Sequence, residues 1–174
     1  MNLQLTLENE LVRIRPLDHS DLELLYEVAK DPKIWEQHPC KRYLKTEFEK
    51  FFSESIESNG ALTILDKTTD KIIGSSRYKI FGEFPNIVEI GWTFLDRSYW
   101  GGKYNEVVKK LMIEHVFNFV NSIIFYVDKN NIRSQKAVEK IGGQRIILES
   151  QFEQLPRTNS QNLTFVINNE KASR

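Results

Sequence analysis

The chain has 174 residues, of which 40% are hydrophobic and 28% are charged, and its 24 basic and 24 acidic residues cancel to a formal net charge of zero. This length predicts a single domain, residues 1–174, and the zero net charge argues against nucleic acid as a partner, because binding to a polyanion needs a clustered excess of basic residues. The single cysteine, Cys40, cannot form an internal disulfide and favours a cytoplasmic, reducing location. Residues 1–10 lack the pattern of a signal peptide, and no apolar run approaches the roughly 20 residues that cross a bilayer, so we expect no membrane partner.

The first half of the sequence alternates strand and helix patterns. In chain order it predicts a strand over 11–15, helices over 18–30 and 45–58, and strands over 61–66, 71–81 and 86–95. Pro16 ends the first strand, the polar turn 67–70 joins the second to the third, and a loop at 82–85 precedes the fourth. The three consecutive strands indicate an antiparallel meander.

The second half predicts a helix over 105–120, a strand over 122–127, a helix over 132–141 and a terminal strand over 162–167. Apolar residues recur at steps of three and four in the first of these helices, so we expect a buried face that includes His115 and Phe119. Gly142 and Gly143 end the second helix, and residues 168–174 are expected to be a frayed tail. The order of elements indicates a mixed α/β fold with one sheet.

A glycine-containing loop, residues 96–104, connects the strand at 86–95 to the long helix. Such a loop can bind an anion, because its backbone N–H groups and the helix N-terminus both present partial positive charge. Alternatively, Gly101 and Gly102 only permit a tight turn, and Asn105 only caps the helix. The loop matches neither the P-loop nor the dinucleotide-binding pattern, which argues against ATP and NAD.

Residues 131–142 read Asn-x-x-Ser-x-x-Ala-x-x-Lys-x-Gly. Together with the opening segment 11–17, the Glu-Ile-Gly strand at 89–91 and the loop and helix after it, this makes four blocks in the order found in the GNAT superfamily of acetyl-CoA-dependent N-acetyltransferases. The chain resembles especially the branch that acetylates the N-termini of ribosomal proteins. The resemblance covers nearly the whole chain and implies a mixed, mostly antiparallel sheet of six to seven strands flanked by about four helices.

The resemblance also implies where acetyl-CoA binds. In the family, a Gln/Arg-x-x-Gly-x-Gly/Ala loop holds the pyrophosphate through backbone amides, whereas here Trp100, Lys103 and Asn105 depart from that pattern. We expect Gly101 and Gly102 to supply the flexibility and Lys103 to add a cation. The implied cofactor-binding residues are Phe94, Leu95, Trp100, Gly101, Gly102, Lys103, Tyr104, Asn105, Asn131, Ser134 and Lys136. Arg97 and Arg133 are further cations near these positions. Each is either a ligand of the cofactor's phosphates or an ordinary solvated charge.

Transfer of an acetyl group to an amine requires a base, a donor to the oxyanion and a proton for the departing thiolate. By resemblance Glu89 is the base, and a backbone N–H near Phe94 and Leu95 is the oxyanion donor. Ser134 supplies the proton, and with Asn131 it grips the pantetheine arm. Two alternatives remain: Glu89 is a solvent-facing strand residue, and Asn131 is simply the N-cap of its helix.

The acceptor amine is left open by the sequence. By analogy with the fold, its site lies around 35–43 and 152–161, and a peptide N-terminus, a small amine or an amino-acid derivative would each be compatible. The three histidines lack metal-ligand spacing with Cys40, so we expect no metal, and we expect a monomer or homodimer. A non-catalytic acyl-CoA-binding module is the alternative function, suggested by Lys103 and Asn105, while the presence of Glu89 together with Ser134 favours an enzyme.

Overall fold

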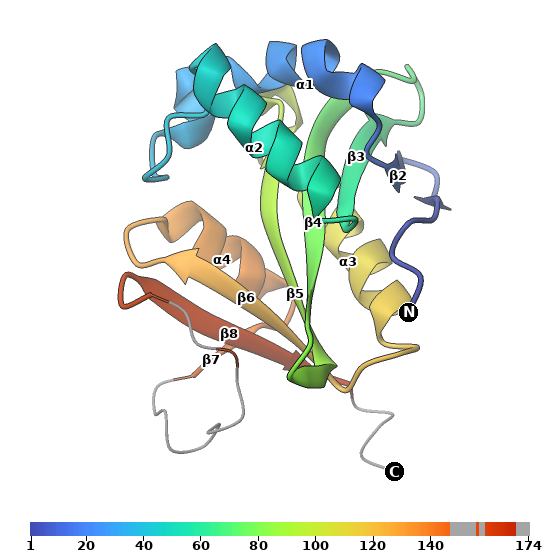
Figure 1. The fold of residues 1–174 in the computed structure, drawn as a ribbon, viewed down its shortest axis with the longest axis vertical. Coiled ribbons are helices and arrows are strands. Elements are labelled where there is room, and N and C mark those ends of the chain that lie inside the picture. The colour runs from blue at the N-terminus through green and yellow to red at the C-terminus, as the bar shows by residue number, and fades with distance from the viewer. Residues whose placement is uncertain (147–155, 157–158, 170–174) are drawn as a thin grey trace.

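The computed structural model describes residues 1–146, 156 and 159–169, and these form one mixed sheet with helices around it (Figure 1). The strands lie in the order β1-β2-β3-β4-β5-β6-β8-β7, and all neighbours are antiparallel except β5 and β6. The strands are β1 Leu7–Glu8, β2 Val12–Pro16, β3 Ala61–Asp66, β4 Ile72–Phe81, β5 Phe84–Leu95, β6 Ser122–Asp128, β7 Gln144–Arg145 and β8 Asn162–Asn168. The helices are α1 Leu22–Ala29, α2 Lys45–Glu57, α3 Tyr104–Val116 and α4 Ile132–Lys140, and the 3-10 turns are η1 His19–Asp21, η2 Pro32–Trp35 and η3 Arg97–Tyr99.

The expected fold class, a mostly antiparallel mixed sheet with four helices, is confirmed for the described part of the chain. The sheet has eight strands rather than six to seven, because β1 and β7 are only two residues long and leave no pattern in the sequence. The long helix ends at Val116 instead of residue 120, and Phe119 is 48% exposed, so its assignment to the buried face was wrong. None of the helices in this part of the chain combines the length and apolarity needed to cross a membrane.

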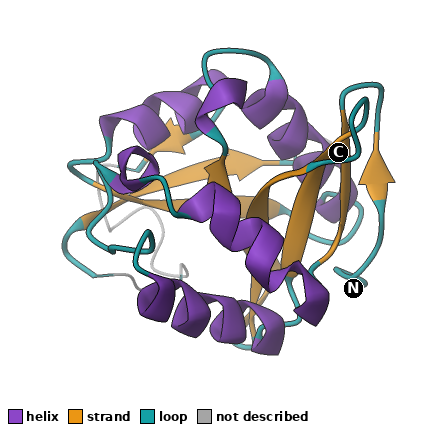
Figure 2. Ribbon diagram, turned by 90° about the horizontal axis from the view of Figure 1, so that it is seen from above, coloured by secondary structure: helices purple, strands orange, loops and turns teal. Residues whose placement is uncertain are grey.

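Helices cover both faces of the sheet (Figure 2). On one face, α3 packs Val108, Met112 and Val116 against apolar side chains of the strands. On the other face, α1 and α2 form a second cluster that is rich in aromatic residues and includes Phe48 and Phe94. The strands between the two clusters are therefore buried on both sides, and their conformation is well determined by packing.

The centre of the sheet contains two irregularities that create a site. The parallel pairing of β5 with β6 extends only from Ile87 to Glu89, after which the two strands separate (Figure 1). Further along β5, Ser75 pairs with Phe94 and Arg77 with Gly91, so Trp92 and Thr93 together oppose the single residue Ser76. This β-bulge places Trp92 at φ +54° and re-aims the end of β5 towards the gap beside β6.

Candidate active site

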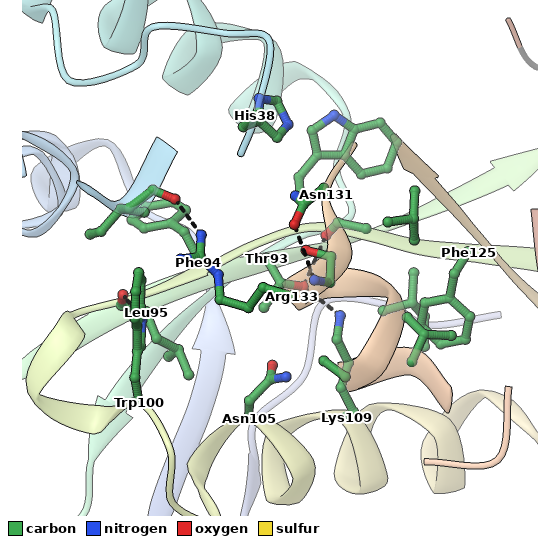
Figure 3. Close-up of a pocket in the computed structure, with 18 of the residues that line it drawn as sticks. His38, Thr93, Phe94, Leu95, Trp100, Asn105, Lys109, Phe125, Asn131 and Arg133 are labelled. Carbon is green, nitrogen blue, oxygen red and sulfur yellow. Dashed lines mark hydrogen bonds between the residues drawn. The ribbon is translucent and has the colours of Figure 1, made fainter. Parts of the chain in front are cut away.

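A cavity of about 380 Å³ lies where β5 and β6 diverge (Figure 3). Residues 90–95 of β5 form one wall and residues 125–128 of β6 form the other. The first turns of α3 and α4 and the segment from Ile34 to Arg42 complete it. A cavity of this volume is typical of small-molecule sites, and this one is bordered by two helix N-termini that favour negative charge.

The loop that leads into α3 is built to leave its backbone accessible. Gly101 has φ +73°, and a Cβ atom added to Gly101 or Gly102 would meet nothing within 4 Å. The Trp100 indole donates a hydrogen bond to the Leu95 carbonyl at 2.9 Å, which fixes the loop to the end of β5. Lys103, not Asn105, is the N-cap of α3, and its side chain makes no capping hydrogen bond, so the helix begins with N–H groups available to an anion.

Most of the residues expected to bind the cofactor meet at this cavity. Those in its wall are Phe94, Leu95, Trp100, Gly101, Gly102, Asn105, Asn131 and Ser134. Lys103, Tyr104 and Lys136 are not among the described residues that line it. The Tyr104 hydroxyl instead donates to Asp66 Oδ2 at 3.3 Å, while Lys103 and Lys136 are exposed.

The N-terminus of α4 combines a structural and a site role. The Asn131 side chain accepts a hydrogen bond from the Ser134 backbone N–H at 3.0 Å, which confirms that Asn131 is the N-cap. Both residues also line the cavity, so capping and a cofactor contact are compatible. The Ser134 hydroxyl has no hydrogen-bond partner among the described residues and is free to serve a ligand.

Arg133, at the start of α4, connects three elements around the cavity. Its guanidinium stacks on the Trp100 ring at 4.0 Å and donates to the Ile34 carbonyl at 2.8 Å. Its backbone N–H donates to Gln37 Oε1 at 3.1 Å. Arg97, by contrast, is held by an ion pair with Asp31. Of these two arginines, Arg133 is the one that lines the cavity.

Glu89 lies where β5 and β6 still pair, next to the cavity. Its side chain is buried, with the residue 6% exposed, so the alternative of a solvent-facing strand residue is wrong. Glu89 is not among the described residues that line the cavity, but its neighbours Ile90 and Gly91 are, and a Cβ atom on Gly91 would lie 3.4 Å from Glu89 Oε1. Burial raises the pKa of Glu89 to about 7, against the opposing charges of Lys79 and Arg77.

Several residues of the cavity wall were not anticipated. Lys109 is 5% exposed, and its Nζ donates to the Thr93 hydroxyl and lies 3.5 Å from Ser76 Oγ. Burial lowers its pKa to about 7. The helical pattern around Val108 and Met112 could have indicated that position 109 also faces inward, but a lysine there reads as a surface residue.

The segment expected near the acceptor does contribute to the cavity, through Trp35, His38 and Arg42. Burial, with the charge of Arg42, lowers the pKa of His38 to about 4, so this imidazole is neutral at pH 7. Its Nδ1 accepts a hydrogen bond from the Cys40 N–H at 3.1 Å, which leaves Nε2 as the protonated nitrogen. The other segment expected there, 152–161, falls mainly on residues 152–155 and 157–158, which lie outside the described residues.

Across residues 1–146, 156 and 159–169, no three His, Cys, Asp or Glu side chains cluster in a way that could hold a metal ion. Cys40 is exposed and unpaired by any disulfide. The polar side chains that line the cavity include the Thr93 and Ser134 hydroxyls, the Asn105 and Asn131 amides and the Arg42 and Arg133 guanidinium groups, together with the carboxylates of Glu106 and Asp128.

Comparison with known proteins gives a family and a fold. The model of the acetyltransferase (GNAT) domain matches residues 12–144, whereas no curated protein matches the sequence. Among similar solved structures is the acetyltransferase (GNAT family) from Bacillus anthracis, 19% identical, with 94% of this chain and 98% of that chain covered and a TM-score of 0.74. A Vibrio cholerae protein assigned as a ribosomal-protein-serine acetyltransferase is 14% identical over 97% of this chain and 100% of that chain, with a TM-score of 0.77. RimJ from Mycobacterium smegmatis, in complex with CoA-disulfide, is 15% identical over 97% of this chain and 88% of that chain, with a TM-score of 0.69.

Proposed function

The chain belongs to the GNAT acetyltransferase family, and we propose that it transfers the acetyl group of acetyl-CoA to a primary amine by direct attack. The observation that supports this best is the cavity at the divergence of β5 and β6, with the N-termini of α3 and α4 on its border and the buried carboxylate of Glu89 beside it. A site for amine acetylation needs such a combination of an anion-binding region and a base.

The anionic part of acetyl-CoA is assigned to the loop before α3. The backbone N–H groups of Gly101 and Gly102 and of the first turn of α3 are accessible, and Arg133 supplies a cation over Trp100. Lys103, Tyr104, Asn105 and Lys136 remain proposed contacts around this loop. The pantetheine arm is assigned to the β5 backbone at Phe94 and Leu95 and to Asn131 and Ser134, which line the cavity further in.

The acid and base chemistry follows from where the polar groups lie. Glu89 accepts a proton from the incoming ammonium group, and a pKa of about 7 keeps it strong enough as a base while a large fraction is ionised at neutral pH. A backbone N–H near Phe94 or Leu95 donates to the thioester oxygen as it becomes negative. The Ser134 hydroxyl, which has no other partner among the described residues, supplies the proton to the CoA thiolate.

The acceptor approaches along the segment that contains Trp35, His38 and Arg42. We propose a peptide N-terminus, of the kind implied by the resemblance to enzymes that modify ribosomal proteins, with a small amine as the second candidate. The same proposal includes one domain over residues 1–174, a cytoplasmic location and a monomeric or homodimeric state.

Release of free CoA thiol on incubation with acetyl-CoA and a panel of amines tests this function. The panel contains N-terminal peptides beginning with Ala or Ser, polyamines and amino sugars, and calorimetry measures acetyl-CoA binding separately. Amine-dependent thiol release supports the transferase. Tight binding of acetyl-CoA with no thiol release in the presence of any amine would identify the non-catalytic acyl-CoA-binding module instead. Absence of acetyl-CoA binding would reject both functions.

A further inference from the structure

The proposed reaction leaves one buried amine at the cavity unused, that of Lys109. This residue lies in the second turn of α3 and lines the cavity (Figure 3). Its Nζ donates a hydrogen bond to the hydroxyl of Thr93, on the bulged part of β5. The next residue along β5 is Phe94, which is assigned to the thioester end of acetyl-CoA. The hydrogen bond therefore holds a primary amine close to the proposed acyl-binding backbone.

The surroundings of Lys109 favour the neutral, nucleophilic form of its amine. Among the described residues, no carboxylate forms an ion pair with Nζ, whose polar neighbours are the hydroxyls of Thr93 and Ser76. The Phe125 ring lies 5.6 Å away. Burial lowers the pKa of Lys109 to about 7, so about half of these amines are unprotonated at pH 7.

The neighbouring residue Lys110 provides a contrast within the same helix. It is exposed, and its Nζ forms an ion pair with Glu106 Oε1 at 2.9 Å. Lys110 also lies outside the cavity wall formed by the described residues. The two adjacent lysines therefore differ in two ways: Lys109 lines the cavity and contacts hydroxyl groups, whereas Lys110 lies outside it and is paired with a carboxylate.

We propose that Lys109 is a self-acetylation site of this protein. The inference rests on the proposed function, because it requires acetyl-CoA in the cavity. The Nζ lone pair attacks the thioester carbonyl carbon, an amide C–N bond forms, and the C–S bond breaks. The amine gives up one proton and the departing thiolate takes up one, so the products are acetyl-lysine at position 109 and CoA thiol.

The modification would change the cavity in two ways. It removes an ionisable amine from the wall, and it adds an acetyl group to a side chain that already packs beside Thr93 and Phe125. Both changes should weaken the binding of another molecule of acetyl-CoA in the cavity. We therefore expect modified protein to bind acetyl-CoA more weakly than unmodified protein, by about tenfold or more.

Mass spectrometry of the intact native chain after incubation with acetyl-CoA tests the proposal. A protease that cleaves after glutamate releases residues 107–114, which contain both lysines, and tandem spectra separate acetylation at Lys109 from acetylation at Lys110. We expect Lys109 to be acetylated about tenfold more than Lys110 in the folded protein and equally in denatured protein. Desulfo-CoA, which lacks the reactive sulfur, should protect Lys109 and leave Lys110 unaffected.

Equal modification of the two lysines, or modification of Lys109 that desulfo-CoA does not suppress, would overturn the proposal. Calorimetry and thiol release on the same preparation separate this failure from failure of the proposed function. Binding and amine-dependent release with unmodified Lys109 reject self-acetylation alone, whereas absence of acetyl-CoA binding rejects both. The variant Lys109→Arg should lose acetylation at position 109, while the matched variant Lys110→Arg should retain it. If Lys109→Arg does not fold, the comparison of Lys109 with Lys110 within the native protein still tests the proposal.

Discussion

The guanidinium carbon of Arg133 lies 4.0 Å from the centre of the Trp100 ring, so a cation carried by α4 covers the loop that leads into α3. Position 100 is where the resembled family has Gln or Arg. Here the stack of Arg133 on Trp100 places a positive charge near position 100, although the charge belongs to α4. This explains how a tryptophan is compatible with a proposed phosphate-binding loop.

Arg133→Ala should weaken acetyl-CoA binding about tenfold, or about 1.4 kcal/mol, because it removes a cation from the wall of the cavity. Calorimetric titration with acetyl-CoA measures the change. Lys136→Ala should have a smaller effect, since Lys136 is exposed and is not among the described residues that line the cavity, and Lys129→Ala on the preceding loop serves as the control. An unchanged dissociation constant for Arg133→Ala would remove this residue from cofactor binding.

Glu89→Gln should lower kcat by about 10²–10⁴ while acetyl-CoA affinity stays nearly unchanged, because the variant loses a base but keeps the shape of the side chain. The base acts only when ionised, so kcat/KM of the native protein should rise with pH and level off above the pKa of about 7. In Glu89→Gln this rise of kcat/KM with pH should disappear, and the pH optimum should move upward. A pH-rate profile of the variant that matches the native one would contradict the role of Glu89.

Asp21→Asn should lower the free energy of unfolding at pH 7 by about 2 kcal/mol. Asp21 is 2% exposed, and it accepts hydrogen bonds at 2.7 Å from both terminal nitrogens of Arg15 and at 2.8 Å from Thr63. Burial alone would raise the pKa of Asp21, but these hydrogen bonds outweigh burial and lower it. The stabilisation is therefore present above the unfolded pKa of 3.8 and is lost as pH falls through the lower folded pKa.

Urea unfolding of the native and Asp21→Asn proteins at several pH values measures this difference, which should shrink towards pH 3. Asp70→Asn is the matched control, because Asp70 pairs with Arg13 at an exposed site. This substitution should lower the free energy of unfolding by less than about 0.5 kcal/mol. A difference for Asp21→Asn that stays constant between pH 7 and pH 3 would show that the charge of Asp21 does not stabilise the fold.

Gly74→Ala should lower the free energy of unfolding by about 3 kcal/mol, because a Cβ atom there would lie 2.1 Å from the Phe94 carbonyl oxygen and would push β4 away from β5. Gly82→Ala, in the turn between the same strands, should change stability by less than about 0.5 kcal/mol, since nothing lies within 4 Å of the added atom. Thermal or urea unfolding of the two variants provides the measurement. Equal stability of the two would show that β4 and β5 can shift at Gly74 without cost.

The parts of the fold that follow from local patterns were predictable from the sequence. The alternation around Ile14 and the helical spacing around Met112 locate β2 and α3, and the resemblance located the loop at Gly101. The environments of Glu89 and Lys109 were not predictable in the same way, because they depend on residues far along the chain that pack against them. A charged side chain is usually exposed, and only tertiary contacts override that tendency.

The bulge on β5 is a second feature that local sequence does not indicate. Trp92 has φ +54°, a conformation that bulky residues rarely adopt, and it is held there by the pairing of Phe94 with Ser75 and by the stack of Arg77 on its ring at 3.9 Å. Propensity at position 92 favours a regular strand. The end of β5, and with it the wall of the cavity, is thus set by the neighbouring strand.

The short pairing of β5 with β6 also has a consequence for association between molecules. Past Glu89, one side of β5 faces the cavity, which gives the sheet an unpaired edge in its middle. Unpaired edges at the outside of a sheet invite strands of other proteins and lead to aggregation. Here residues of α3 and α4 line the same cavity as this edge, which places the two helices beside the unpaired backbone of β5. The unpaired edge of β5 therefore lies at a cavity in the middle of the sheet, and not at the outer edges, which are formed by β1 and β7.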